Sequence, residues 1–115
     1  MTIKINYKNF ELTESISEKV NNVFIKFYKF VAESSIFDIL LERDSKHHKQ
    51  GEVYKIKAEM RNGKNFYHVE VLGEDIYMMI DEAGEKLERE IKEGGDKKRS
   101  LTKKLGRKFK DIFFR

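Results

Sequence analysis

Three histidines are the residues of this sequence that are best suited to metal or proton chemistry. His47 and His48 are adjacent in a polar stretch that follows Asp44, whereas His68 stands alone in an alternating segment. Imidazole and carboxylate groups bind metal ions, but these residues lack the regular spacing of a ligand motif. The chain contains no cysteine, which excludes a thiolate site and a cysteine nucleophile. We predict no metal site and no catalytic residue, and a metal-dependent enzyme using Asp44, His47 and His48 remains an alternative.

Carboxylates are the second group of residues that could act as acids and bases. Five glutamates fall within one predicted helix, at Glu82, Glu85, Glu88, Glu90 and Glu93. The pairs Glu85–Arg89 and Glu88–Lys92 have the i,i+4 spacing that stabilises an exposed helix face. The chain also lacks a glycine-rich phosphate loop and a nucleophile elbow. The glutamates therefore predict a solvated helix face, and we expect no enzyme activity and no cofactor.

Positive charge is concentrated at the C-terminal end of the chain. The net charge is +4, but residues 94–115 hold nine basic and two acidic residues, against 15 and 18 in residues 1–93. Such an asymmetry indicates a polyanionic partner, either nucleic acid or an anionic membrane. Lysine and arginine bind RNA phosphates without reading sequence. The candidate RNA-binding residues are Lys19, Lys26, Lys29, Lys86, Arg89, Lys92, Lys97, Lys98, Arg99, Lys103 and Lys104.

Two further residues are candidates for RNA contact, each with a structural alternative. Tyr77 lies beside the apolar stripe of a predicted helix, where it either packs against the sheet edge or meets RNA through its ring or hydroxyl. His68 is predicted to be an exposed strand residue, which either has no specific partner or contacts a phosphate.

Hydrophobic periodicity predicts the elements that position these residues. Apolar residues alternate in strands and recur every three or four residues in helices. Thr13 is expected to cap the first helix, Asn62-Gly63 to form a hairpin turn and Gly94-Gly95 to end the second helix. The expected elements are a strand at 2–7, a helix at 13–31, strands at 36–43, 52–61 and 64–72, and a helix from 74–75 to 93.

This order predicts an α+β fold, β-α-β-β-β-α, with one open sheet face. The first two strands are expected to be parallel with a right-handed crossover, and strands two to four to form an antiparallel meander. Both helices should cover the same face of the four-stranded sheet, which gives a two-layer sandwich. The open face should present Lys4, Lys55, Lys57, Arg61 and His68 among Asp38, Glu42, Glu59 and Glu70.

The chain of 115 residues is expected to form one domain, at 1–93, followed by a basic tail at 94–115. The tail has an amphipathic spacing that is compatible with a helix. Its apolar residues are Leu101, Leu105, Phe109, Ile112 and Phe113. An alternative function follows from this pattern: a membrane-surface or protein-interaction module that acts through the tail.

The second predicted helix also carries a motif. The run Glu-Asp-Ile-Tyr-Met-Met-Ile-Asp at 74–81, followed by Lys-Leu-Glu-Arg at 86–89, resembles the signature of the family of hibernation-promoting factor and ribosome-associated inhibitor A, the sigma-54 modulation proteins. The resemblance covers residues 1–93 and includes Ile-Lys-Ile at 3–5 and Leu-Thr-Glu-Ser-Ile at 12–16.

The resemblance implies a fold similar to double-stranded-RNA-binding domains with an added first strand. It implies a cytoplasmic, non-catalytic protein that binds the small ribosomal subunit and its rRNA in the channel between head and body. There it would compete with mRNA and tRNA and keep the ribosome inactive during stress or stationary phase. The length suggests a short form without the family's C-terminal dimerisation domain, monomeric off the ribosome and without membrane association.

Overall fold

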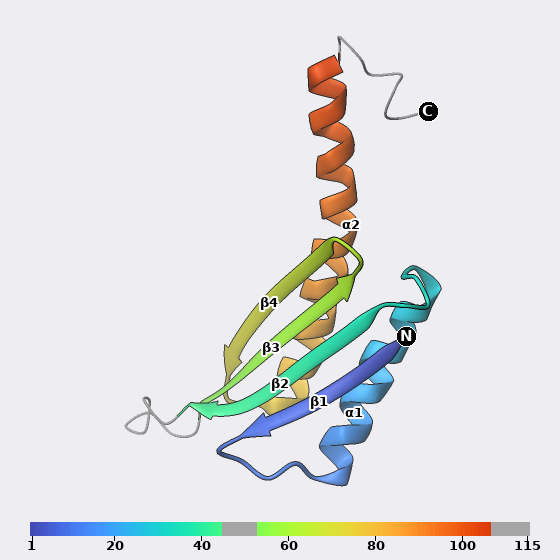
Figure 1. Cartoon of the computed structure of the whole chain (residues 1–115). Coiled ribbons are helices and arrows are strands. Elements are labelled where there is room, and N and C mark those ends of the chain that lie inside the picture. Colours follow the sequence, from blue (N-terminus) through green and yellow to red (C-terminus); the bar gives the residue numbers. More distant parts are fainter. Residues whose placement is uncertain (45–52, 107–115) are drawn as a thin grey trace.

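The structure is a computed structural model that describes residues 1–44 and 53–106, with backbone alone for residue 44 and for residues 95–106. A four-stranded sheet is covered on one face by the helices (Figure 1). The elements are β1 (Thr2–Lys8), α1 (Glu14–Phe24), the 3₁₀ helix η1 (Ile25–Lys29), β2 (Ile36–Asp44), β3 (Val53–Asn62), β4 (Asn65–Gly73) and α2 (Ile76–Gly106).

The sheet has the predicted topology, with strand order β1-β2-β3-β4. β1 and β2 pair in parallel, whereas β2–β3 and β3–β4 are antiparallel. Because side chains alternate along a strand, each cross-strand row belongs to one face. One such row runs from Ile5 through Ile39 and Ala58 to Val69 and lies under the helices. The predicted two-layer α+β sandwich is therefore confirmed.

The core lies between the sheet and the two apolar helix stripes, as the periodicity predicted. Ile16, Val20 and Phe24 of α1 are buried, and so are Ile80 and Leu87 of α2. Tyr7 lies in register with buried Leu41, but its side chain is exposed near the end of edge strand β1.

The first helix begins as predicted but ends earlier. The Thr13 side chain accepts a hydrogen bond from the backbone N–H of Ile16 at 3.2 Å, so it is the N-cap. The α-helix ends at Phe24 and continues as η1, whereas the pattern predicted one helix to residue 31. The aromatic residues Phe24, Phe27 and Phe30 recur every three residues, which is the period of a 3₁₀ helix.

The second helix begins at its predicted place but does not end at Gly94-Gly95. The Asp75 side chain caps it by accepting hydrogen bonds from the backbone N–H groups of Tyr77 and Met78, at 3.0 and 3.2 Å. α2 then continues through Gly94 to Gly106. A Cβ atom at Gly94 would lie 2.9 Å from Cε1 of Tyr67, so this glycine allows the helix to pass close to β4.

The β3–β4 hairpin turns one residue later than expected. Asn62 pairs with Asn65, so Gly63 and Lys64 form the two-residue turn. Gly63 has a φ of +61°, which suits a glycine at the first central position of a hairpin turn. The division into 1–93 and 94–115 stays a prediction, although α2 runs across its boundary.

Candidate nucleic-acid interface

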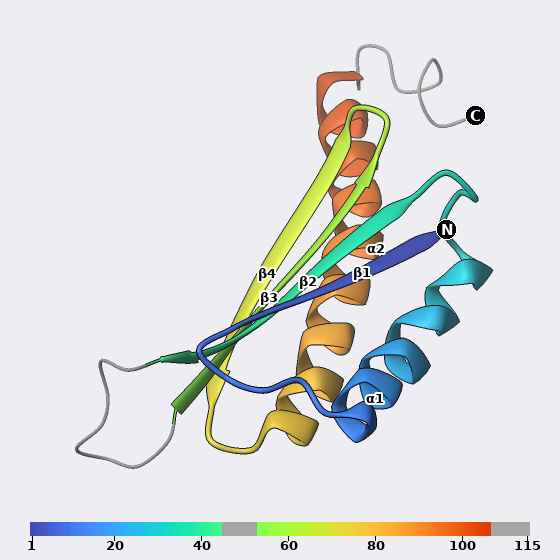
Figure 2. The same ribbon diagram turned by 60° about the horizontal axis from the view of Figure 1, so that its bottom comes forward.

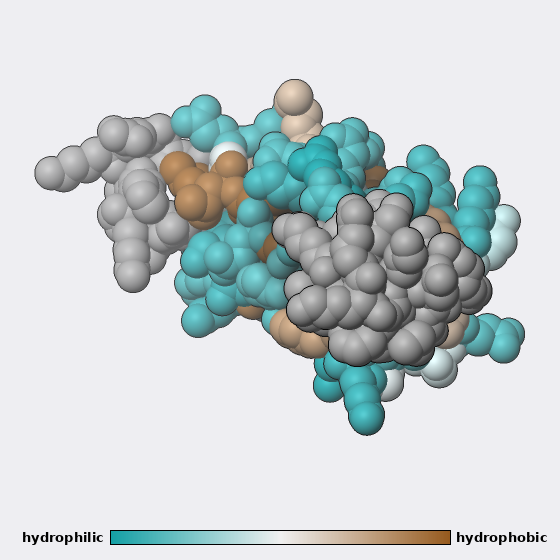
Figure 3. All heavy atoms as spheres, turned by 90° about the horizontal axis from the view of Figure 1, so that it is seen from above, coloured by the Kyte–Doolittle hydropathy of each residue, from teal (hydrophilic) through white to brown (hydrophobic). Residues whose placement is uncertain are grey.

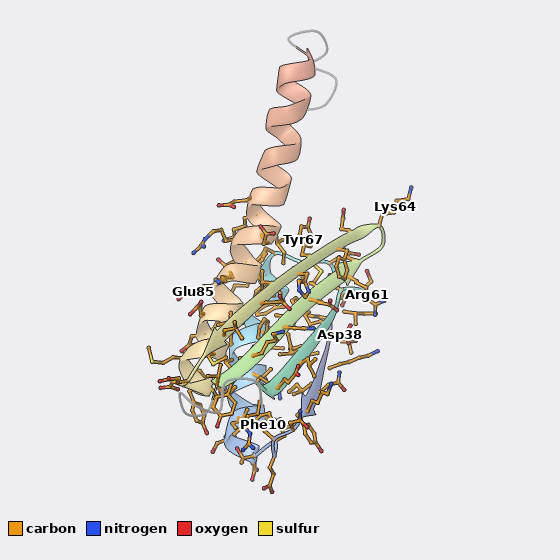
Figure 4. All side chains as sticks on the ribbon, turned by 90° about the vertical axis from the view of Figure 1, so that its left-hand side faces the viewer. Phe10, Asp38, Arg61, Lys64, Tyr67 and Glu85 are labelled. Carbon is orange, nitrogen blue, oxygen red and sulfur yellow. The ribbon has the colours of Figure 1, made fainter. Side chains whose placement is uncertain are left out.

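On the open face of the sheet, Lys57, Arg61 and His68 have carboxylate partners, so part of the positive charge of this face is offset. Arg61 lies 3.4 Å from the Asp38 carboxylate, on the side of the sheet away from the helices (Figure 4). His68 Nδ1 is 3.0 Å from a Glu59 oxygen, and its Nε2 is 3.9 Å from Glu70. Where opposite charges lie this close together, they attract phosphate groups only weakly.

His68 therefore lies apart from the other candidate RNA-binding residues. Its strand position is exposed, as predicted, but it is on the face opposite the helices and beside two carboxylates. Tyr77 lies in the first turn of α2 with 43% of its surface exposed. Both alternatives for Tyr77, packing against the sheet edge and contact with RNA, remain predictions.

The helix layer brings together basic residues that are far apart in the sequence. Nζ of Lys19 on α1 lies 2.9 Å from the Asp81 carboxylate on α2, and Lys92 of α2 lies over the Phe30 ring at 5.0 Å. Lys19 contacts the first part of α2, and Phe30, which comes later in the chain, contacts a residue further along α2. The two helices therefore run in the same direction. Figure 2 shows the two helices side by side behind the sheet.

The basic residues of α2 are less available for RNA than their sequence suggested. Lys92 pairs with Glu88 at 2.9 Å, as its spacing predicted, and Lys86 pairs with Glu82 at 3.4 Å, which was not predicted. The predicted pair of Arg89 with Glu85 is absent from the described residues. Exposed pairs of this kind add little stability, but each carboxylate offsets the positive charge beside it.

Lys26 and Lys29, by contrast, are free of ion pairs within the part of the chain that the structure describes. Both side chains are exposed on η1, at the C-terminal end of the first helical segment. η1 thus carries two uncompensated positive charges on the helix layer. Sequence reasoning named these lysines, and the i,i+4 spacing of Glu88 and Lys92 was its one correct signal of an acidic partner on α2.

Beyond the sheet, α2 continues as a projecting helix (Figure 1). This extension, residues 95–106, holds the remaining basic candidates. They are Lys97, Lys98, Arg99, Lys103 and Lys104. Because α1 and α2 run in the same direction, η1 and the extension lie toward the same end of the molecule (Figure 2). The surface seen in Figure 3 is mostly hydrophilic around this end.

Metal binding and membrane insertion find no support in the described residues. No group of three or more histidine and acidic side chains in this part of the chain is arranged to hold a metal ion. The alternative site at Asp44, His47 and His48 lies outside the described side chains, as do Phe109, Ile112 and Phe113 of the tail. No described helix is both long and apolar enough to cross a membrane.

Together the fold and its surface define a small α+β domain with a charge-paired sheet face and a basic end on its helix layer. The family model described as "Sigma 54 modulation protein / S30EA ribosomal protein" matches residues 3–99, and the chain belongs to this family. The family comprises ribosome-associated factors and is not an enzyme family, so the chain has a ribosome-related role.

Solved structures of the same fold agree with this assignment. The N-terminal domain of Thermus thermophilus Protein Y is 19% identical, with a TM-score of 0.67 over 81% of this chain and 98% of that one. A ribosomal subunit interface protein from Coxiella burnetii is 13% identical, with a TM-score of 0.66 over 84% of this chain and 99% of that one. No curated protein matches the sequence. These likenesses confirm the fold.

Proposed function

We propose that this protein is a cytoplasmic ribosome hibernation factor. It binds rRNA of the small ribosomal subunit in the channel for mRNA and tRNA, and inhibits translation during stress or stationary phase. Family membership supports the ribosomal partner. The observation that supports RNA contact is the basic end formed by η1 and the extension of α2, on the layer opposite the charge-paired sheet face.

The mode of action that this surface supports is occlusion without chemistry. Phosphates are bound by charge and by release of counterions, and structured RNA is recognised through its shape and backbone. A rigid sandwich holds the basic helices in fixed positions, so the bound protein would occupy space that mRNA and tRNA need. The protein would leave intact every bond of the ribosome, and its effect would be reversible.

Co-sedimentation with purified small subunits in a sucrose gradient tests the proposal. We expect the protein to travel with the subunit at low salt and to be released as salt rises. If about five phosphates are neutralised, the affinity should fall with a log–log slope of about −3.5 to −4.5. Pre-bound mRNA and tRNA should reduce binding. A protein that stays at the top of the gradient at low salt would contradict the proposal.

The ion pairs on α2 give a second expected result. Replacing Glu82 and Glu88 with glutamine removes the carboxylates that hold Lys86 and Lys92, at 3.4 and 2.9 Å. Both lysines then become available to phosphates, and two repulsive charges are lost. We expect subunit affinity to rise by several-fold at low salt, because exposed charges interact most strongly there.

The matched control replaces Glu42 and Glu59 with glutamine, which removes two acids from the open face of the sheet. We expect this control to change affinity by less than about twofold, since the face lies away from the proposed interface. Equal gains in both double variants would mean that overall charge, and not the helix surface, governs binding.

A further inference from the structure

The 3₁₀ helix η1 sorts its side chains into three rows. A 3₁₀ helix has three residues per turn, so residues three apart lie above one another. Phe24, Phe27 and Phe30 form the inner row, with ring centroids 5.5 Å apart for the first pair and 5.0 Å for the second. Phe24 and Phe27 are buried, so this row anchors η1 to the core.

The other two rows face solvent. Lys26 and Lys29 form a basic row, and both lack ion pairs within the described residues. Ile25 and Tyr28 form an apolar row beside it, and they are 51% and 64% exposed. Unlike the three phenylalanines, Tyr28 has no aromatic partner in the part of the chain that the structure describes. An aromatic ring with free faces therefore stands next to two uncompensated positive charges.

We propose that Tyr28 stacks on one unpaired RNA base while Lys26 and Lys29 hold the phosphates that flank it. Aromatic side chains bind single-stranded nucleic acid by stacking on bases, and basic side chains follow the backbone. Unpaired nucleotides in loops and bulges are the parts of a folded RNA whose bases are accessible in this way. The inference rests on the proposed RNA-binding function and adds an unpaired nucleotide as a specific contact.

Other exposed aromatic residues of the helix layer fit this role less well. One face of the Phe30 ring is covered by the Lys92 ammonium at 5.0 Å. Tyr77 follows Glu74 and Asp75, and the Asp75 carboxylate accepts a hydrogen bond from the Tyr77 backbone N–H at 3.0 Å. Negative charge beside a base would repel its phosphates. Tyr28 instead has Lys26 two positions before it and Lys29 directly after it in the sequence.

The test compares four full-length variants with the wild type for affinity to small ribosomal subunits and to a labelled uridine decamer. Tyr28→Ala and Tyr28→Leu remove the aromatic ring, and we expect each to weaken binding by about tenfold. Tyr28→Phe keeps the ring and should stay within about twofold. Tyr7→Ala is the matched control, because Tyr7 is also exposed but lies on β1.

Two further measurements separate stacking from charge. A decamer whose bases are replaced by abasic residues should bind the wild type and Tyr28→Ala equally, since no base remains to stack. Tyr28→Ala should leave the salt slope unchanged, whereas Lys26→Ala with Lys29→Ala should reduce it by about 1.4 to 1.8.

Equal affinity of the wild type and Tyr28→Ala for the subunit overturns the inference. If the lysine variant still weakens binding in that case, the proposed RNA-binding function stands without a stacking contact. A wild-type protein that binds neither the subunit nor the decamer overturns both. The inference is also overturned if Tyr28→Ala weakens binding but Tyr28→Leu binds as tightly as the wild type, because an apolar contact would then suffice.

Discussion

A chain cut after Gly94 and carrying Lys86→Ala, Arg89→Ala and Lys92→Ala is expected to lose its occupancy of the small subunit. The cut removes nine basic and two acidic residues, and the substitutions remove three more positive charges. Phosphate contacts supply most of such binding, so we expect affinity to fall on the order of 100-fold or more at moderate salt. Pelleting with subunits through a sucrose cushion measures the loss.

The cut should leave the sandwich folded, which makes this experiment interpretable. Among the side chains of α2 that the structure describes, Leu87 is the last that is fully buried, and Ile91 packs partly against the core. Circular dichroism and thermal unfolding of the variant should therefore resemble those of the full chain.

The matched control is the full chain with Lys4→Ala, Lys8→Ala and Lys55→Ala. These three lysines lie on the open face and have no ion pairs in the described residues, so the control loses as many positive charges there as the three α2 substitutions remove from the helix. Subunit occupancy should change little. Undiminished occupancy of the cut and substituted chain would show that positive charge on α2 and the tail does not hold the protein on the ribosome.

The fold follows closely from periodicity, because burial on one face imposes a regular pattern on every element. Alternation placed Ile5, Ala58 and Val69 each on one side of its strand, and these residues form one row across the inner face of the sheet together with Ile39. The caps were predictable from local chemistry: Thr13 bonds within the first turn of its helix. The order of elements then left few topologies to consider.

Features that depend on contacts between distant segments were not predictable from local patterns. Gly94 resembles a helix stop, but the close approach of Tyr67 gives it a packing role inside α2. The three-residue spacing of the phenylalanines was compatible with an α-helix until their mutual ring contacts showed the tighter η1.

The candidate interface was predictable in its residue types but not in its balance of charges. Lys19 pairs with Asp81, which is 62 residues away in the sequence, so no local rule reveals that this lysine is compensated. Lys26 and Lys29 looked equivalent to Lys86 and Lys92 in the sequence, yet only the latter pair has acidic partners. These ion pairs shift the expected RNA contact from Lys86 and Lys92 of α2 toward Lys26 and Lys29 of η1.

The crossing of α1 and α2 gives the largest expected effect on stability. A Cβ atom at Gly84 would lie 2.5 Å from Cγ1 of Val23, closer than two carbon atoms can approach. Valine in a helix strongly prefers one rotamer, so Val23 has little freedom to move aside. Overpacking typically costs about 1–3 kcal/mol, whereas the higher helix propensity of alanine returns about 1 kcal/mol. Gly84→Ala should thus lower the free energy of unfolding by up to about 2 kcal/mol.

Urea unfolding of Gly84→Ala, Val23→Ala and the double variant forms a cycle that isolates this contact. Val23→Ala removes the atom that clashes, so the double variant should be more stable than the sum of the single effects by about 1 kcal/mol or more. Glu85→Ala, at the exposed neighbouring position of α2, is the control and should change stability by less than about 0.5 kcal/mol. Additive effects, or a stabilised Gly84→Ala protein, would show that the helices do not cross as closely as the structure places them.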